Sequence, residues 1–314
     1  MRDKFIQTLA EIARKDPRVI LITGDLGFKV LDNFKKEFPR QFINAGVSEQ
    51  NMTMVATGMA QEGRIVFTYS IGNFPTLRCL EMIRNDAAYH EANVKIVCIG
   101  GGFSYGALGS SHHASEDITV MRSLSNVTTI VPTGLWETEE ATRTIYSRRG
   151  TCYLRLDKDR GIDLKNPVAF QLGVPRRIKM GKDLAILATG GIISEVMASL
   201  EALAKRGINP SIFSVHTLNP IQEREYIKIA KAHKALLTVE ENSVRGGLGG
   251  MILEALAKYG AVPKSFASLG IENAFTKKTG SQKYLRKTHK IDASSIAKHA
   301  FMLFTEKLTN RNKH

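Results

Sequence analysis

The stretch that decides the fold is Phe42-Ile43-Asn44-Ala45-Gly46-Val47-Ser48-Glu49-Gln50-Asn51-Met52. It starts apolar and reaches Gly46, which permits a sharp turn from strand to helix. The pattern then predicts a helix from Glu49 to Ala60, with Ser48 as its N-cap. Taken alone, Glu49 is an acidic residue in a first helical turn, where the helix dipole favours a negative charge.

The first half of the chain alternates short apolar strands with helical segments. The expected strands are Val19–Ile22, Ile65–Tyr69, Val94–Ile99, Val127–Val131 and Cys152–Leu156. The expected helices are residues 3–15, Glu49–Ala60, Pro75–Tyr89, Ser115–Leu124 and Leu135–Ser147. Continuous apolar strands separated by helices indicate a parallel sheet covered on both faces. Residues 1–157 are therefore predicted to form a doubly wound α/β domain.

The alternation of apolar strands and helices stops after residue 157 and begins again at residue 183. Residues 158–182 are charged and contain Pro167 and Pro175, so we expect a connector. A smaller α/β domain is predicted over residues 183–314. Its expected strands are Leu184–Leu187, Ser211–Val215, Ala235–Val239 and Ser265–Leu269, and its expected helices are Ile193–Lys205, Gln222–Ala232 and Leu248–Tyr259. The fold class is α/β, with two doubly wound domains and mainly parallel sheets.

The composition fits a soluble protein with two buried cores. The chain has 314 residues, of which 43% are hydrophobic and 24% charged. No apolar run is long enough to cross a bilayer, and no signal-peptide core follows Met1, so a cytoplasmic protein is expected. The three cysteines, Cys79, Cys98 and Cys152, lie far apart in apolar segments. They are predicted to be buried thiols, with no disulfide and no metal site.

The formal net charge is +14, and much of the excess lies late in the chain. Basic residues gather at Lys277-Lys278, Lys283, Arg286-Lys287, Lys290 and the Arg311–His314 tail. Such a charge is compatible with nucleic acid, an anionic substrate or an acidic partner. The sequence carries no motif that reads DNA and no RNA-binding aromatic signature, so we expect no nucleic acid. Phosphorylated sugars and an acidic partner explain the charge at least as well.

Three further strand ends carry polar or glycine-rich segments: Thr23-Gly24-Asp25-Leu26, Tyr69-Ser70-Ile71-Gly72-Asn73-Phe74 and the stretch from Gly109 to Asp117. Together with the turn from Gly46 to Met52, they resemble the pyrimidine-binding domain of the transketolase family of thiamine diphosphate enzymes. The resemblance runs from about Asp3 to Leu303. It is strongest to the C-terminal subunit of a transketolase that is split into two polypeptides. It implies a pyrimidine-binding domain followed by a transketolase C-terminal domain.

The resemblance implies a set of cofactor-binding residues. Glu49 matches the glutamate of the family's G-x-x-E-x-x-M turn, which bonds N1′ of the cofactor's aminopyrimidine. Phe74 matches the aromatic residue that stacks on that ring, although a core phenylalanine at a strand–helix junction is equally compatible with the local sequence. Asp25 and Leu26 match the segment beside the cofactor. For Asp25 the alternative is a residue that caps the next segment.

The resemblance also implies substrate-binding residues. His112 matches the histidine that faces the substrate's reacting hydroxyl and carbonyl, where it can donate or shuttle a proton. His113 beside it is assigned to the substrate side with no defined role. Adjacent side chains point in different directions and no third ligand follows, so this pair predicts no metal site.

Some positions depart from full-length transketolases. Gly100 stands where those enzymes have a phosphate-binding histidine, and Leu108 where they have an aspartate that reads sugar hydroxyls. Arg155 is a candidate ligand for a substrate phosphate, with a salt bridge to Asp157 or Asp159 as the alternative. The glycine-rich segments 100–102 and 245–250 fit neither a P-loop nor a dinucleotide fingerprint, so close packing or subunit contact is expected.

A diphosphate-binding constellation is missing from the sequence. The family holds Mg²⁺ and the cofactor's diphosphate with a Gly-Asp-Gly motif and a later asparagine, and this chain has no such set. The resemblance therefore implies a partner, an N-terminal subunit that holds most of the magnesium site, in an α2β2 heterotetramer. The expected function is transfer of a two-carbon ketol unit from a ketose phosphate to an aldose. The alternatives are a 2-oxoacid dehydrogenase β subunit, a 1-deoxyxylulose-5-phosphate synthase-like enzyme and a non-catalytic regulatory subunit.

Overall fold

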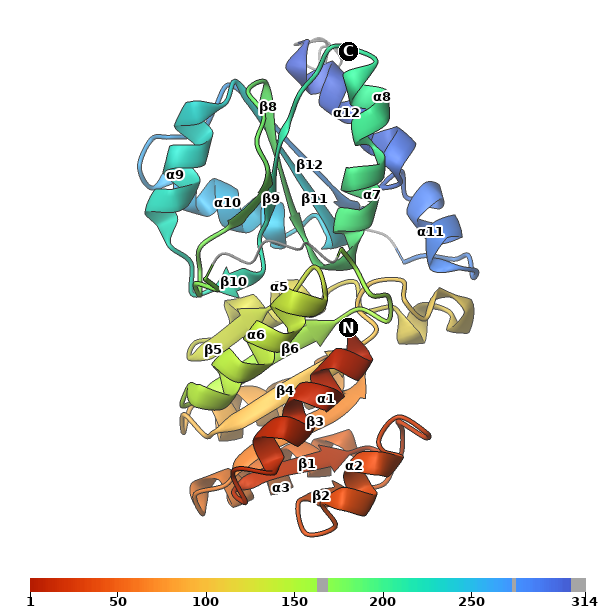
Figure 1. Ribbon diagram of the computed structural model, residues 1–314, viewed down its shortest axis with the longest axis vertical. Coiled ribbons are helices and arrows are strands. Elements are labelled where there is room, and N and C mark those ends of the chain that lie inside the picture. The colour runs from red at the N-terminus through yellow and green to blue at the C-terminus, as the bar shows by residue number, and fades with distance from the viewer. Residues whose placement is uncertain (163–168, 273–274, 306–314) are drawn as a thin grey trace.

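The computed structural model describes residues 1–162, 169–272 and 275–305. Pro167 and the Arg311–His314 tail lie outside these ranges. The described chain forms two α/β domains stacked along the long axis of the molecule, with the N-terminus near their junction (Figure 1). The predicted fold class, with two mainly parallel sheets, is confirmed.

The first domain is built on a seven-stranded sheet with the order β10-β5-β6-β4-β3-β1-β2. Its parallel strands are β1 (Val19–Thr23), β2 (Phe42–Asn44), β3 (Ile65–Ile71), β4 (Val94–Ile99), β5 (Val127–Ile130) and β6 (Thr151–Leu156). The edge strand β10 (Thr217–Asn219) runs antiparallel to β5 and comes from the second half of the chain. Strand β10 is not predicted from the sequence, because three residues are too few to carry a strand pattern.

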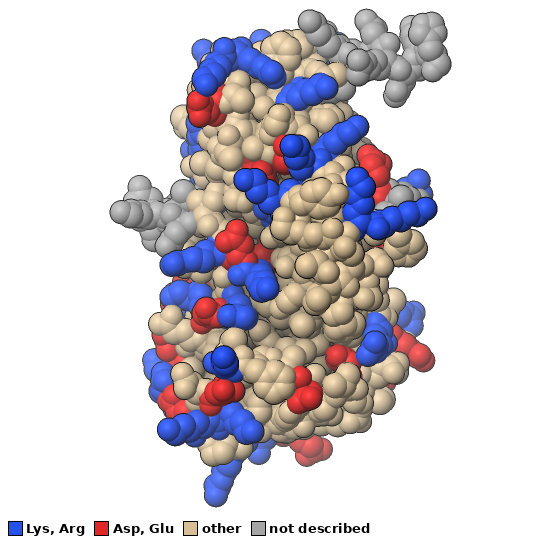
Figure 2. Space-filling view, turned by 90° about the vertical axis from the view of Figure 1, so that its right-hand side faces the viewer, with Lys and Arg blue, Asp and Glu red and all other residues tan. Residues whose placement is uncertain are grey.

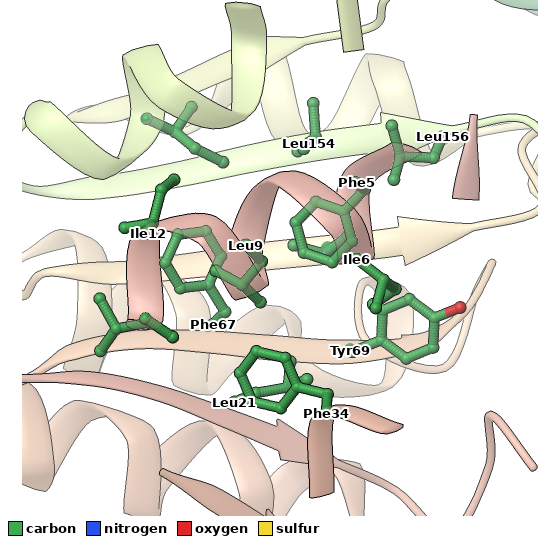
Figure 3. Packing of buried hydrophobic residues seen from close by; sticks show 14 of the residues in the cluster. Phe5, Ile6, Leu9, Ile12, Leu21, Phe34, Phe67, Tyr69, Leu154 and Leu156 are labelled. Carbon is green, nitrogen blue, oxygen red and sulfur yellow. The ribbon is translucent and has the colours of Figure 1, made fainter. Parts of the chain in front are cut away.

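Helices cover both faces of this sheet, as the continuous apolar strands predict. One face carries α1 (Arg2–Ala13), α2 (Asp32–Glu37) and α6 (Leu135–Ser147), and the other carries α3 (Glu49–Gln61) and α5 (Asp117–Ser123). Figure 3 shows Phe5 and Leu9 of α1 packed against Phe67 and Tyr69 of β3. Burying each of these side chains stabilises the fold by roughly 1.5–3 kcal/mol. The apolar residues at helical spacing on α1 therefore hold this helix against the sheet.

The helix expected over Pro75–Tyr89 is not one continuous α-helix. It consists of the 3-10 turn η1 (Leu77–Cys79), the short α4 (Leu80–Met82) and the π-helical segment η2 (Ile83–Ala88). Ile83 and Ala87 pack into the core on the α3 side of the sheet. A π-helical turn often marks a functional site.

The second domain has a five-stranded sheet with the order β12-β11-β8-β9-β7. Its strands are β7 (Arg176–Lys179), β8 (Leu184–Thr189), β9 (Ser211–Ser214), β11 (Ala235–Ser243) and β12 (Ser265–Ile271). Strand β7 pairs antiparallel with β9, although it lies inside the predicted connector, residues 158–182. Strand β7 has the sequence Arg-Arg-Ile-Lys and lies at the edge of the sheet. Because it contains no apolar run, the sequence pattern does not predict it.

Helices also cover both faces of the second sheet. One face carries α7 (Ile193–Ala198), α8 (Leu200–Ala204) and α12 (Ala293–Phe304), and the other carries α9 (Glu223–Ala232) and α10 (Leu248–Ala257). The single helix expected over Ile193–Lys205 is thus divided at Ser199. Helix α12 and the short α11 (Gln282–Thr288) are not among the helices expected from the sequence.

A buried polar network joins the two domains. The Glu241 carboxylate on β11 accepts a hydrogen bond from the Phe103 backbone N–H in the first domain (2.6 Å) and pairs with Arg286 (2.7 Å). Both charged side chains are almost fully buried, so removing either would leave the other without its partner. This network holds the loop after β4 against the second domain.

Two expectations from composition can be compared with the structure. Cys79, Cys98 and Cys152 are all buried and free, as predicted. Within the described residues, no helix is long and apolar enough to cross a membrane. On the face seen in Figure 2, lysines and arginines are spread over both domains among acidic side chains.

Candidate active site

The carboxyl ends of the parallel strands bring the predicted site residues to one edge of the first sheet. Thr23, the last residue of β1, pairs with Asn44 on β2 and with Tyr69 on β3. The segments that follow these three strands therefore begin side by side. Ligands of open α/β sheets bind outside this edge.

Glu49 is the first residue of α3 and its side chain points inward. The turn before it is made by Gly46, which has a φ of +73°. Ser48 occupies the N-cap position, as predicted, although its side chain makes no capping hydrogen bond. Only 2% of Glu49 is exposed, and its Oε1 accepts a hydrogen bond from the Ser70 hydroxyl (3.3 Å). A first-turn glutamate stabilised only by the helix dipole would be free to face solvent, whereas this carboxylate is enclosed.

Phe74 and His112 lie against each other beside Glu49. Their rings meet edge to face, with centroids 5.1 Å apart. Arg78 connects them to the carboxylate, because its Nη1 donates to Glu49 Oε2 (3.2 Å) and its guanidinium carbon lies 5.3 Å from the centre of the Phe74 ring. Phe74 is only half-buried, so it is not a core phenylalanine. The structure thus brings Glu49, Phe74 and His112 together.

Asp25 lies at the rim of this group and is exposed. Its backbone N–H donates to Asn44 Oδ1 (3.0 Å), and Asn44 Nδ2 donates to its carboxylate (3.0 Å). Asn44 Oδ1 also accepts from the Gly46 backbone N–H (3.0 Å), so it ties the two turns to each other. Leu26 points elsewhere and packs against the core beneath α1. Of this predicted pair, only Asp25 faces the turn that carries Glu49.

His113 has different neighbours from His112. It is 2% exposed, its ring stands edge to face with Phe103 at 5.1 Å, and its Nε2 lies 3.4 Å from the Gly106 carbonyl oxygen. Burial lowers the pKa of this imidazole. His113 thus packs toward the domain junction, whereas the ring of His112 contacts Phe74. The expectation that His113 lies on the substrate side stays a prediction.

Arg155 is held by other groups of the protein. It forms a salt bridge with Asp117 (3.2 Å), and both side chains are at most 2% exposed. Its Nη2 donates to the carbonyl oxygens of Ala114 (3.2 Å) and Glu241 (2.8 Å). The predicted phosphate ligand is thus a buried structural arginine, and the alternative salt bridge is made with Asp117 rather than with Asp157 or Asp159.

The glycine-rich segments serve close packing. A side chain on Gly101 would collide with Arg155, and one on Gly102 would collide with Glu241. The N-terminus of α10 is occupied by a side chain of the same protein: the Glu240 carboxyl group accepts from the backbone N–H groups of Leu248 (2.8 Å) and Gly249 (3.1 Å). No free anion is needed at this helix N-terminus, which agrees with the packing role expected for the segment.

Several residues of the site were not identified from the sequence. They are Asn44, Ser70, Asn73 and Arg78. Asn73 donates to the His113 carbonyl oxygen, while its own buried Oδ1 has no hydrogen-bond partner among the described residues. Two signals were available: Ser70 is a polar residue in an apolar strand, and Arg78 follows Phe74 by four residues. In the structure Phe74 lies in the turn before η1 and Arg78 lies within η1, and the two side chains meet there.

Within the described residues, no group of three or more histidine, cysteine, aspartate or glutamate side chains is arranged to hold a metal ion. The adjacent His112 and His113 do not form one, because their side chains contact Phe74 and Phe103 respectively. The site is therefore an enclosed carboxylate, an aromatic ring and an imidazole at the edge of a sheet.

Comparison with known protein families gives two matches that together cover most of the chain. Residues 1–161 match the transketolase pyrimidine-binding domain, and residues 173–296 match the transketolase C-terminal domain. The first match contains every residue of the candidate site. The second begins before β7 and so agrees with the observed extent of the second sheet.

Individual relatives match over nearly their whole length. A putative transketolase C-terminal section from Methanocaldococcus jannaschii is 38% identical over 95% of this chain and 94% of its own. One of the subunits of an apulose-4-phosphate transketolase from Phocaeicola vulgatus is 31% identical over 87% of this chain and 88% of its own. The solved structure of a split-gene transketolase, an inactive β4 tetramer, has a TM-score of 0.87 and 28% identity, and the match covers 97% of this chain and 98% of that one.

Proposed function

The chain belongs to the transketolase family, and from this premise we propose that it is the C-terminal subunit of a two-chain, thiamine diphosphate-dependent transketolase. The observation that carries the proposal is the contact chain from Glu49 through Arg78 to Phe74 and His112. A structural surface would not need an enclosed carboxylate, a half-exposed aromatic face and a histidine within one group. Convergent polar residues at a sheet edge are typical of a site.

The residues fit the pyrimidine half of the cofactor. Glu49 offers a carboxyl group shielded from water, and Phe74 offers a ring on which a flat heterocycle can stack. Asn73 Oδ1 is a buried acceptor that has no partner among the described residues, and it is suited to an amino group. A methyl group on Gly24 would lie 3.4 Å from Glu49 Oε1, so the chain leaves this carboxylate room on that side.

The proposed roles of the residues follow from this fit. Thiamine diphosphate, when bound, supplies a carbanion at C2 and an electron sink for cleavage of the ketose. Glu49 shares a proton with N1′ of the aminopyrimidine, while Ser70 orients the carboxyl group by its hydrogen bond. Phe74 holds the ring by stacking. His112 donates a proton to the substrate oxygen, or accepts one from it, as carbon–carbon cleavage proceeds.

We assign the diphosphate tail and Mg²⁺ to a separate subunit. The described residues supply no metal cluster. Four exposed apolar residues lie close to Glu49 in the elements around it: Val47 just before α3, Met54 and Val55 on α3, and Leu77 on η1. We assign these four residues to one contact surface. Exposed apolar patches mark interaction sites. An α2β2 assembly would cover this surface with the partner, and the similar split-gene transketolase is described as inactive when it is a tetramer of β chains.

The proposed substrates are phosphorylated sugars, with a ketose as donor and an aldose as acceptor. The relative from Phocaeicola vulgatus is named for apulose-4-phosphate, and the net charge of +14 favours anionic ligands. Because Arg155 and His113 are buried, neither is proposed as the phosphate ligand.

The experiment that tests this function is reconstitution. The chain alone and the chain mixed with a subunit carrying the Gly-Asp-Gly domain are assayed with ketose phosphates and, separately, with pyruvate as donors. We expect negligible activity alone and ketol transfer from ketose phosphates in the mixture. Strong activity without the partner would contradict the two-chain proposal, and turnover of pyruvate alone would favour a synthase or dehydrogenase.

A further inference from the structure

Arg78 makes two contacts at once in the candidate site. It lies at the middle of η1, its side chain is about half exposed, and its Nη1 donates to Glu49 Oε2 at 3.2 Å. Its guanidinium carbon also lies 5.3 Å from the centre of the Phe74 ring. A guanidinium packed over an aromatic face while bonded to a carboxylate is favourable in both contacts.

These two partners are the ones that the proposed function assigns to the aminopyrimidine ring. The guanidinium is flat, carries N–H donors and faces the same carboxylate and the same aromatic side chain. It differs in its proton: the guanidinium can only donate to the Glu49 carboxylate, whereas N1′ shares one proton with it. Arg78 and the cofactor need the same carboxylate and the same ring face, so they cannot bind there together.

We propose that Arg78 occupies the aminopyrimidine position in the cofactor-free subunit and leaves Glu49 and Phe74 when thiamine diphosphate binds. This inference rests on the proposed function. In the cofactor-free chain, Arg78 is a positioning residue: it gives the enclosed carboxylate a charged partner and keeps Phe74 in place. It withdraws easily, because half of its side chain is already in contact with solvent.

Removing Arg78 should therefore tighten cofactor binding. Without it, Glu49 keeps one side-chain partner among the described residues, Ser70, at the long distance of 3.3 Å, and Phe74 loses its contact with the guanidinium. In the variant, a larger fraction of the protein has Glu49 and Phe74 free of Arg78 before the cofactor binds. The apparent affinity for the cofactor rises by the same factor as this fraction. An ion pair with one exposed member, together with one cation–π contact, corresponds to about a threefold to tenfold change.

The test is calorimetric titration of the reconstituted two-chain protein. Wild type, Arg78→Met and Arg78→Lys are titrated with thiamine diphosphate plus Mg²⁺ and, separately, with inorganic diphosphate plus Mg²⁺. We expect Arg78→Met to bind thiamine diphosphate about threefold to tenfold more tightly, with diphosphate binding unchanged. The affinity of Arg78→Lys for thiamine diphosphate should lie between those of wild type and Arg78→Met. An ammonium group can pair with Glu49, but it does not stack on Phe74 as a planar guanidinium can.

Arg84→Met is the matched control. Arg84 is an exposed arginine on the neighbouring η2 that bonds Asn85, so its removal changes the charge without touching Glu49. Weaker or unchanged binding of thiamine diphosphate by Arg78→Met would overturn the inference, and a parallel loss of diphosphate binding would place Arg78 at the tail of the cofactor instead. Absence of cofactor binding by wild type would overturn the proposed function, and this inference with it.

Discussion

The guanidinium of Arg155 lies 3.2 Å from the carboxylate of Asp117, and both side chains are at most 2% exposed. The same guanidinium donates to the backbone of Ala114 in the first domain and of Glu241 in the second. One buried arginine thus neutralises a buried acid and joins the domains beside the loop that carries His112. Its position at the end of a sheet strand is where a ligand contact would be expected, which explains why sequence alone favoured a phosphate ligand.

Replacing Arg155 should therefore destabilise the fold. Arg155→Met leaves the buried Asp117 without its cationic partner, with only the Tyr153 hydroxyl still donating to it among the described residues, and should lower the free energy of unfolding by about 3–5 kcal/mol. Chemical denaturation of the single chain measures this change. Arg177→Met, at an exposed position on β7, is the control and should leave stability within about 0.5 kcal/mol. Normal stability of Arg155→Met, combined with a raised KM for a phosphorylated donor, would instead restore Arg155 as a ligand.

Glu49→Gln tests the proposed chemistry in the two-chain enzyme. Glutamine fills the same space and can keep the hydrogen bond with Ser70, but its amide cannot transfer a proton to N1′ or take one from it. We expect kcat to fall by about a hundredfold or more while the cofactor still binds. Glu62→Gln, just beyond the exposed end of α3, should leave kcat unchanged. A turnover rate near that of wild type would mean that the subunit does not use this carboxyl group.

Two glycines that flank Glu49 should respond in opposite ways to alanine. Gly24 has an ordinary backbone conformation, and a methyl group there would meet Glu49 Oε1 at 3.4 Å, so Gly24→Ala should raise the free energy of unfolding by about 0.5 kcal/mol. Gly46 has open space around it but a φ of +73°, so Gly46→Ala should cost about 1 kcal/mol or more. Thermal unfolding measures the melting temperature of both variants. Equal changes in melting temperature would contradict the explanation from backbone conformation.

The sequence predicts much of the scaffold, because apolar strands and amphipathic helices are set by local periodicity. It also identifies Glu49, Phe74 and His112, which the structure brings together. It does not predict β7 or β10, because charged or very short edge strands lack a pattern. Their pairing depends on residues far away in the chain.

Burial is the property that sequence reasoning missed at the site. Arg155 and His113 are polar residues near a strand end, and nothing in their neighbours indicates that the second domain covers them. Glu241 of the second domain contacts Arg155, and it also bonds Phe103, the neighbour of His113 in the first domain, from 138 residues away. Arg78 is not predicted because it is half exposed, and exposed arginines are common. Its role depends on the side chain of Glu49, which points inward and pairs with it.

The carboxyl group of Glu240 accepts hydrogen bonds from the first backbone N–H groups of α10, inside the second domain. Complete burial raises its pKa from the usual 4.5 to about 7, and this outweighs the two backbone hydrogen bonds that favour the ionised form. Between these two pH values the folded chain holds the proton more tightly than the unfolded chain does. This group therefore stabilises the fold below about pH 4.5, and its contribution is lost as the pH rises through about 7.

Glu240→Gln removes this titration and should flatten the pH dependence. Relative to the variant, wild type should lose on the order of 3 kcal/mol of unfolding free energy between pH 4.5 and pH 7. Denaturation curves at a series of pH values measure the difference. Glu201→Gln, at an exposed residue paired with Lys205, is the control and should follow wild type. If the difference grew as the pH fell, the helix N-terminus rather than burial would govern this carboxyl group.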